Sequence, residues 1–151
     1  MNSEPDTHQA SNPGDAAGVA RSLAQVTSAV VGIVLVVAGV LGFFYGDSSF
    51  GVGDNLKSGE LFGFAVNGWH NVVHVATGAF LLLMMASATS AAVGLLAFGV
   101  VYGVVTVWGF IDTSDIAMLI PVDTADNVLH AVLAVLGIVV AIAAGGLKRR
   151  A

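Results

Sequence analysis

The chain has 151 residues, of which 56% are hydrophobic and 10% charged, with a mean hydropathy of +0.88 and a formal net charge of −5. This composition is too apolar for a soluble domain of this length. Because there is no cysteine, disulfides, thiolate nucleophiles and Cys-ligated metal sites are excluded. Four uncharged runs of about 20 residues can span the hydrocarbon core as helices and are too long for barrel strands.

The chain begins with a polar segment that has too little apolar surface to fold alone. Residues 1–20 are rich in Ser, Asn, Asp, Pro and Gly, so we expect a disordered cytoplasmic tail there. Acidic residues precede the first Arg, unlike in a secretory signal, so the helix that follows is predicted to be retained. Residues 21–151 are predicted to form one transmembrane domain. Its spans cover about residues 23–45, 67–86, 91–111 and 124–146.

The connections between the spans predict the arrangement of the helices. The link at residues 87–90 is short and uncharged, so the second and third helices are expected to be antiparallel neighbours. Longer polar connections follow the first span, at residues 47–66, and the third, at residues 112–123. We therefore predict an all-α integral membrane four-helix bundle with up-down-up-down topology.

Basic residues predict the orientation of the bundle. Arg21 flanks the first span and the basic residues 148–150 flank the last, whereas the opposite side carries only Lys57. The positive-inside rule therefore places both termini in the cytoplasm. Trp69 and Trp108 then fall at the outer interface, where amphipathic rings are favoured.

A nine-residue segment occurs twice, each time at the start of a span. V-N-G-W-H-N-V-V-H ends at His74, and V-D-T-A-D-N-V-L-H ends 56 positions later at His130. Each copy offers a helix N-cap: Asn67 in the first, and Asp123 or Thr124 in the second. Because both copies start from the same side, we predict two helical hairpins that form a parallel internal repeat.

Each copy places polar side chains on one face of its helix. The Asn and His of a copy are three residues apart, and another polar residue lies four positions before each His. Both histidines would lie roughly 10 Å into the membrane from the same side. We expect a polar cluster in the outer leaflet that links the second and fourth helices. Its candidate residues are His70, Asn71, His74, Asp126, Asn127 and His130.

One interpretation of the cluster is structural. A polar side chain in lipid needs a hydrogen-bond partner, and bonds between helices contribute about 0.6–2 kcal/mol. Asn71 could bond to His130, and Asn127 to His74, in a clasp that fixes the register of the two helices. The other two polar residues, in the first helical turn, are then expected near the water interface.

The other interpretations involve a ligand. Zinc or copper would suit the donor types of His70, His74, Asp126 and His130. Haem could be held between the two histidines that end the copies, and a quinone or other lipid-like molecule could be bound by the polar pairs. The spacing H-x-x-x-H is that of a zinc protease, but Asn71 stands where the general-base Glu is needed, so a hydrolase is not expected.

Two motifs resemble the signatures of a protein family. The first comprises residues 61–63, Val66, residues 70–74 and Gly78, and the second comprises residues 120–122 and 125–130. Over about residues 20–146 the chain resembles domain-of-unknown-function family 4383, whose members are bacterial, mostly actinobacterial, four-helix membrane proteins. The resemblance implies this fold in a prokaryotic plasma membrane and implies no activity. Its pattern includes Asn71, His74, Asn127 and His130.

We predict a non-catalytic structural or interaction protein of the membrane, with a binder of metal, haem or a lipid-like molecule as the alternative. Catalytic motifs, a phosphate loop and a basic nucleic-acid patch are missing from the sequence. The middles of all four spans lack the acidic or basic group that ion-coupled transport usually needs, and Tyr102 is interpreted as packing. Expected partners are the lipid bilayer and, through the glycine pairs Gly42/Gly46 and Gly99/Gly103, other membrane proteins or a second copy.

Overall fold

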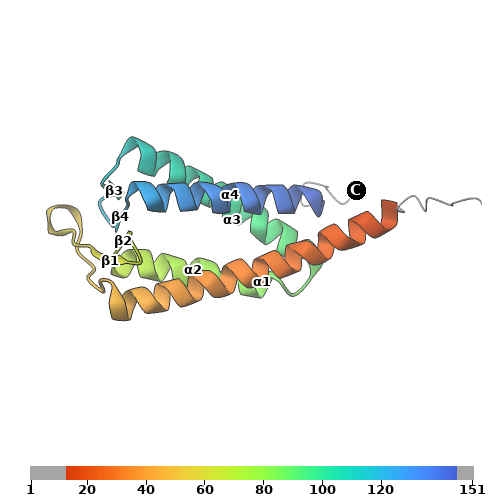
Figure 1. Ribbon diagram of the computed structural model, residues 1–151, viewed down its shortest axis with the longest axis horizontal. Coiled ribbons are helices and arrows are strands. Elements are labelled where there is room, and N and C mark those ends of the chain that lie inside the picture. The colour runs from red at the N-terminus through yellow and green to blue at the C-terminus, as the bar shows by residue number, and fades with distance from the viewer. Residues whose placement is uncertain (1–12, 146–151) are drawn as a thin grey trace, which may run out of the picture.

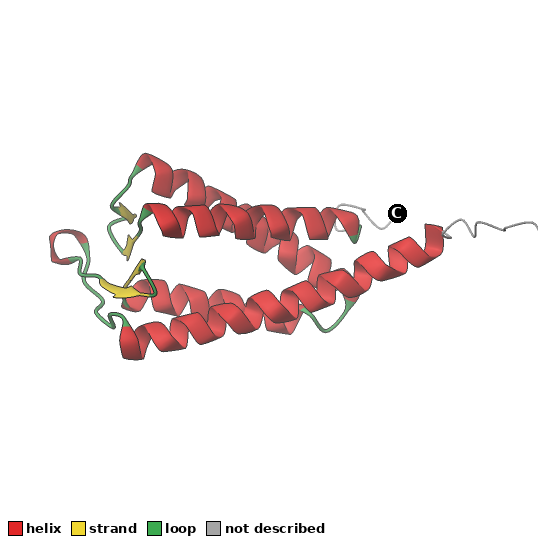
Figure 2. Ribbon diagram, in the orientation of Figure 1, coloured by secondary structure: helices red, strands yellow, loops and turns green. Residues whose placement is uncertain are grey.

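The computed structural model describes residues 13–145, which form a bundle of four helices (Figures 1 and 2). The helices are α1 (Pro13–Tyr45), α2 (Gly68–Met84), α3 (Ala88–Ile111) and α4 (Thr124–Ala143). Within the described residues, α1, α3 and α4 are long and apolar enough to cross a membrane. With its 17 residues, α2 is shorter and extends over about 25 Å. The predicted all-α membrane four-helix bundle is confirmed.

Most helix boundaries agree with the prediction, but α1 begins ten residues earlier, at Pro13 rather than at residue 23. Residues 13–20 were expected in a disordered tail and are helical instead. Their alanines favour the helix, and Pro is tolerated in a first turn, where its missing N–H is not needed. The remainder of the expected tail, residues 1–12, and the basic residues 148–150 lie outside the described residues.

Both long connections contain a small β-hairpin that was not predicted. The strands are β1 (Gly59–Leu61), β2 (Phe64–Val66), β3 (Asp115–Ile116) and β4 (Ile120–Pro121), and a 3-10 turn, η1 (Gly53–Asn55), precedes β1. β1 pairs with β2 and β3 with β4, both antiparallel. The two β-hairpins lie together at the end of the bundle where α2 and α4 begin (Figure 1).

The helices pack as two helical hairpins, α1 with α2 and α3 with α4 (Figure 1). Glycine lets the backbones approach closely in both. A Cβ atom on Gly32 would lie 2.9 Å from the carbonyl oxygen of Gly78, and one on Gly99 would lie 2.8 Å from that of Ala134. The helices α2 and α3 are antiparallel neighbours, as expected, but they touch less than the helices within a hairpin do.

The contacts within the two hairpins correspond position by position. Ala134 follows Gly78 by 56 positions, and Gly99 follows Gly32 by 67 positions. The two offsets differ by 11 residues, which is close to the 10 residues by which the connection at residues 46–67, with η1 in it, exceeds the connection at residues 112–123. The polar residues at the starts of α2 and α4 therefore occupy matching places in the two hairpins.

Candidate functional site

Two N-cap residues set the starts of α2 and α4. The side-chain oxygen of Asn67 accepts the backbone N–H of His70 at 2.9 Å. In the same way, the carboxylate of Asp123 accepts the N–H of Asp126 at 2.9 Å. Both predicted caps are confirmed, with Asp123 rather than Thr124 in this role. Because the caps fix the first turn, the polar residues that follow point in defined directions.

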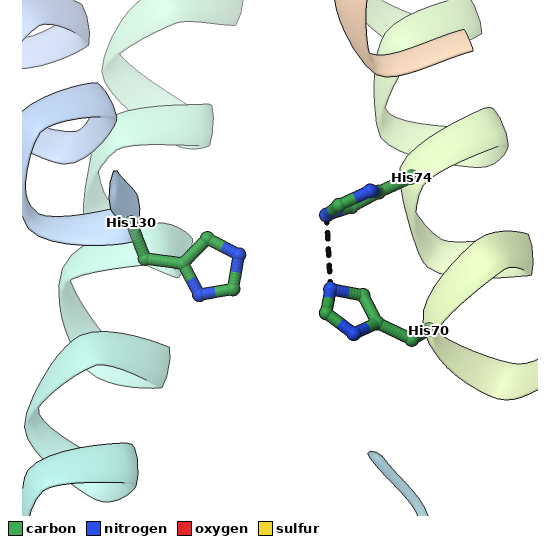
Figure 3. Close-up of side chains that lie close together, drawn as sticks. All are labelled: His70, His74 and His130. Atoms are coloured by element: carbon green, nitrogen blue, oxygen red, sulfur yellow. Dashed lines mark hydrogen bonds between the residues drawn. The ribbon is translucent and has the colours of Figure 1, made fainter. Parts of the chain in front are cut away.

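His70 and His74 lie on the face of α2 that is turned toward α4 (Figure 3). Their Nε2 atoms are 3.1 Å apart and share a hydrogen bond. Nδ1 of His70 lies 3.0 Å from the carbonyl oxygen of Ala65 in β2. Because a carbonyl oxygen only accepts, Nδ1–H of His70 donates to it, and in the neutral ring Nε2 of His70 accepts the Nε2–H of His74. The lone pair of His70 Nε2 therefore faces His74.

Asp126 and His130 present matching groups from α4. Oδ1 of Asp126 lies 3.5 Å from Nε2 of His130 and 3.9 Å from Nε2 of His70. The His130 ring points across to α2, and its centroid lies 5.9 Å from that of His70 and 6.1 Å from that of His74 (Figure 3). One ligand nitrogen from each of the three histidines lies within 4.8 Å of the others.

The cluster is closed off from solvent. Only 2% of His70, 1% of Asp126 and 4% of His130 is exposed, and His74 is partly buried. The first-turn residues His70 and Asp126 were expected to reach water at the interface, and this is wrong because protein covers them. The physical reason is the pair of β-hairpins, which lie over the starts of α2 and α4 (Figure 1).

Asn71 and Asn127 are buried but serve their own hairpins. Nδ2 of Asn71 donates to the carbonyl oxygen of Asp47 at 2.8 Å, and Nδ2 of Asn127 donates to that of Gly109 at 2.8 Å. The predicted clasp, in which each Asn bonds to the histidine of the other copy, is wrong. Glycine explains the outcome: a Cβ atom on Gly42 or Gly109 would collide with the amide, so the neighbouring helix leaves room for it there.

Tyr102 of α3 was not predicted as a neighbour of the cluster. Its ring lies edge-to-face with that of His130, at a centroid distance of 5.0 Å. Its hydroxyl group lies 3.2 Å from Oγ1 of Thr77, which is one turn beyond His74 on α2. Tyr102 therefore closes the cluster on the side away from the β-hairpins. No sequence signal distinguishes this Tyr from one that faces lipid, because its position depends on how α3 packs.

Four side-chain atoms of the polar cluster lack a hydrogen-bond partner among the described residues: Oδ1 of Asn71 and of Asn127 and, between α2 and α4, Oδ2 of Asp126 and Nδ1 of His130. A buried carboxylate without donors is costly, so such groups are normally paired or bound to a cation. His70 and His74 from α2 and His130 from α4 each bring one ligand nitrogen to this point, and Oδ1 of Asp126 lies beside them, 3.5 Å from Nε2 of His130. This arrangement is chemically suited to hold a cation.

The fold and the cluster define a multi-pass membrane protein with a buried His/Asp cluster between two helical hairpins. The chain belongs to the family described as Domain of unknown function (DUF4383), whose model matches residues 25–143. The matched region includes the cluster and nearly the whole bundle, and the resemblance noted in the sequence is confirmed. No curated protein and no solved structure matches the chain.

Proposed function

We propose that this chain is a membrane metal-binding protein in which one divalent transition-metal ion, in the first place zinc, joins the two helical hairpins. The ligands would be His70, His74, Asp126 and His130. The proposal rests on one observation above all: three imidazoles from two helices bring their ligand nitrogens within 4.8 Å of one another. A core histidine with a purely structural role has no need of two others at this distance.

The distances in the cluster fit a tetrahedral ion. Zinc binds N and O ligands at about 2.0–2.2 Å, so neighbouring ligand atoms lie roughly 3.3 Å apart. The Nε2 atoms of His70 and His74 are 3.1 Å apart, and Oδ1 of Asp126 lies 3.5 Å from His130. Oδ1 of Asp126 is 3.9 Å from Nε2 of His70, and the three histidine nitrogens lie within 4.8 Å of one another, so the side chains would draw closer together around a bound ion. Copper accepts the same donors and is the main competitor.

A site of this kind supports a non-catalytic role. Four protein ligands close a tetrahedral site, as in structural zinc centres, whereas catalytic centres keep one position for water or substrate. Each hairpin contributes two of the four ligands, so the ion would act as a cross-link between hairpins. The protein would then be a structural or interaction protein of the membrane that depends on metal, rather than an enzyme.

Haem and a quinone fit the cluster less well. The His70 ring lies 4.4 Å from the His74 ring and 5.9 Å from the His130 ring, measured between centroids. His70 therefore takes up the space that a porphyrin plane between the other two rings would need. Tyr102 crowds the His130 ring as well. A single ion is the ligand that this crowded space favours.

Metal analysis of the protein purified in detergent tests the proposal. We expect one zinc or copper ion per chain, and its loss in His74→Ala and in Asp126→Asn. The fourth histidine of the chain, His8, lies outside the described residues and is not a proposed ligand. His8→Ala is therefore a matched control that should keep the ion. A wild-type protein without stoichiometric metal after reconstitution with Zn²⁺ or Cu²⁺ would refute the proposal, and a Soret band would favour haem instead.

The cluster is proposed to lie in the outer leaflet of a prokaryotic plasma membrane, with both termini in the cytoplasm. The basic residues near the two ends of the chain support this orientation. The chain has no cysteine, so single cysteines can report it directly. An impermeant thiol reagent added to intact cells should label Ser114→Cys and leave Thr89→Cys unlabelled. The reverse pattern would overturn the orientation.

We also propose that the two helical hairpins are copies of one unit. The constant offsets between their contacts support this, as does the ligand set, because His70 corresponds to Asp126 and His74 to His130. Exchanging the first pair, in the double variant His70→Asp/Asp126→His, keeps the donor set and should keep metal binding to within about tenfold. Complete loss in the exchanged variant, at unchanged folding, would contradict the equivalence of these positions.

A further inference from the structure

The N-cap residues of α2 and α4 have a second set of contacts beyond their caps. Asn67 and Asp123 occupy matching positions, 56 residues apart, and Asn67 is fully buried. Each uses one side-chain oxygen to accept the N–H of the third residue of its helix. The other side-chain group of each residue is left free to bond elsewhere, and both groups point away from their own helix.

Each free group reaches the connection of the opposite hairpin. Nδ2 of Asn67 donates to the carbonyl oxygen of Leu119 at 2.8 Å. Oδ2 of Asp123 accepts the N–H of Ala65 at 2.6 Å. The two bonds are reciprocal: the first hairpin holds the connection of the second, and the second holds that of the first. We call this pair of bonds the clasp of Asn67 and Asp123; it is not the clasp of Asn/His pairs that the sequence suggested.

The clasp is connected to the proposed metal site through the residues that Asn67 and Asp123 cap. The residue that Asn67 caps is His70, and the residue that Asp123 caps is Asp126, and both are proposed ligands. Ala65 in β2 adds a third link between the clasp and the site. The N–H of Ala65 donates to the Asp123 carboxylate, and the carbonyl oxygen of Ala65 accepts the Nδ1–H of His70. A residue at the start of α4 therefore helps to orient a ligand on α2.

Within the described residues, one further hydrogen bond joins the two connections, from the backbone N–H of Gly53 to the carbonyl oxygen of Met118 at 3.0 Å, but neither of these residues caps a ligand. The helices α2 and α4 scarcely touch along their backbones and face each other across the cluster. A metal site loses affinity when its ligands are misplaced by about 1 Å, which is why the groups that orient ligands matter. We propose that Asn67 and Asp123 are positioning residues that hold the two halves of the metal site in register. This inference rests on the proposed metal-binding function.

Two near-isosteric substitutions test the clasp without removing either cap. Asp123→Asn keeps an oxygen for the N–H of Asp126 but turns an NH₂ group toward the N–H of Ala65. Asn67→Asp keeps its cap as well but turns a carboxylate oxygen toward the Leu119 carbonyl. In both variants the reciprocal bond becomes a repulsive contact between like groups, while α2 and α4 keep their starts.

We expect each variant to bind Co²⁺, a visible stand-in for zinc, 10–100-fold more weakly in a chelator competition, with a changed d–d absorption spectrum. The control is Asp115→Asn, in the β-hairpin formed by β3 and β4. It weakens a bond of similar length, from the Met118 N–H to Oδ1 at 2.6 Å, that lies within one β-hairpin and does not join the two helical hairpins. It should leave both affinity and spectrum unchanged. Wild-type affinity in Asp123→Asn and Asn67→Asp would overturn the inference.

A second measurement keeps the test independent of the metal. Spin labels on Val72→Cys and Val128→Cys, two exposed positions on α2 and α4, report the distance between the hairpins without any ion. Asp123→Asn should broaden this distance distribution and Asp115→Asn should not. If the wild-type protein binds no metal, the proposed function fails. Unchanged distances in Asp123→Asn would then also refute the alignment by the clasp, and broadened ones would sustain it.

Discussion

The interface inside each helical hairpin differs in kind from the interface between the hairpins. Inside, glycine sits against backbone: a Cβ atom on Gly78 would lie 2.6 Å from the carbonyl oxygen of Gly32, and one on Gly137 would lie 2.9 Å from that of Leu95. Between the hairpins lie imidazoles, a carboxylate and the clasp. Inside the hairpins the helices are held by close backbone packing and by amide bonds from Asn71 and Asn127, whereas at the junction a carboxylate oxygen and a ring nitrogen, Oδ2 of Asp126 and Nδ1 of His130, lack a partner. The hairpins therefore resemble preformed units, and their junction is where a ligand can change stability.

Removing metal should have the largest effect, and it should act only on the junction. A ligand present at about 1,000 times its Kd stabilises a protein by about 4 kcal/mol. We expect Zn²⁺ to raise the thermal midpoint of the wild-type protein in detergent and a chelator to lower it again. His74→Ala should not respond to either. A similar response in His74→Ala would place the zinc effect outside the cluster.

The glycine interface should respond to substitution but not to metal. Gly99 and Gly103 lie one turn apart on α3, yet a Cβ atom on Gly99 would lie 2.8 Å from the Ala134 carbonyl oxygen, and one on Gly103 would meet nothing closer than 4.0 Å. We predict that Gly99→Ala destabilises by about 1–3 kcal/mol through overpacking and that Gly103→Ala does not. The stabilisation by zinc should remain in Gly99→Ala. Equal midpoints for the two variants would contradict the packing of α3 on α4.

The same comparison shows what the sequence could and could not predict. The helices, their alternating directions and the pairing of His70 with His74 follow from local rules, namely the length of apolar runs and the helical period. The glycine pair Gly99/Gly103 suggested close packing, but only the structure shows that Gly99 is used within the chain. Association with other proteins through glycine faces stays a prediction.

The partners of the polar residues depended on contacts that no local rule contains. Asn127 could have bonded to His74, but Gly109 on the adjacent helix offers a closer carbonyl. The strands of the β-hairpins are two or three residues long, too short to show a strand period, so the cover over the cluster and the clasp of Asn67 and Asp123 could not be foreseen.

Replacing Asn127 should reduce stability by an intermediate amount and should affect the interface inside the second hairpin but not the junction between the hairpins. The amide bond of Asn127 to Gly109 lies inside the second hairpin, so Asn127→Ala should destabilise by about 1 kcal/mol without lowering metal affinity. Since Asn127 and His74 share no hydrogen-bond partner, the double variant with His74→Ala should cost the sum of the two single effects to within about 0.5 kcal/mol. The measurement is thermal unfolding of the four proteins without metal. A double variant that costs much less than the sum would restore the clasp that the sequence suggested.

The smallest effect concerns Tyr102, which belongs to the junction but binds no metal in our proposal. Its hydroxyl group and Oγ1 of Thr77 form the one side-chain bond between α3 and α2 among the described residues. Bonds between membrane helices contribute about 0.6 kcal/mol on average in double-mutant cycles, so Tyr102→Phe and Thr77→Val should each cost about that much. Their double variant should cost little more than either alone, because one bond is lost in all three. Metal affinity should stay within about twofold of wild type, since the ring that packs on His130 is kept in Tyr102→Phe. A tenfold loss of affinity in Tyr102→Phe would instead place its hydroxyl group among the groups that bind or orient the ion, and the junction would then extend one helical turn deeper than the four ligands.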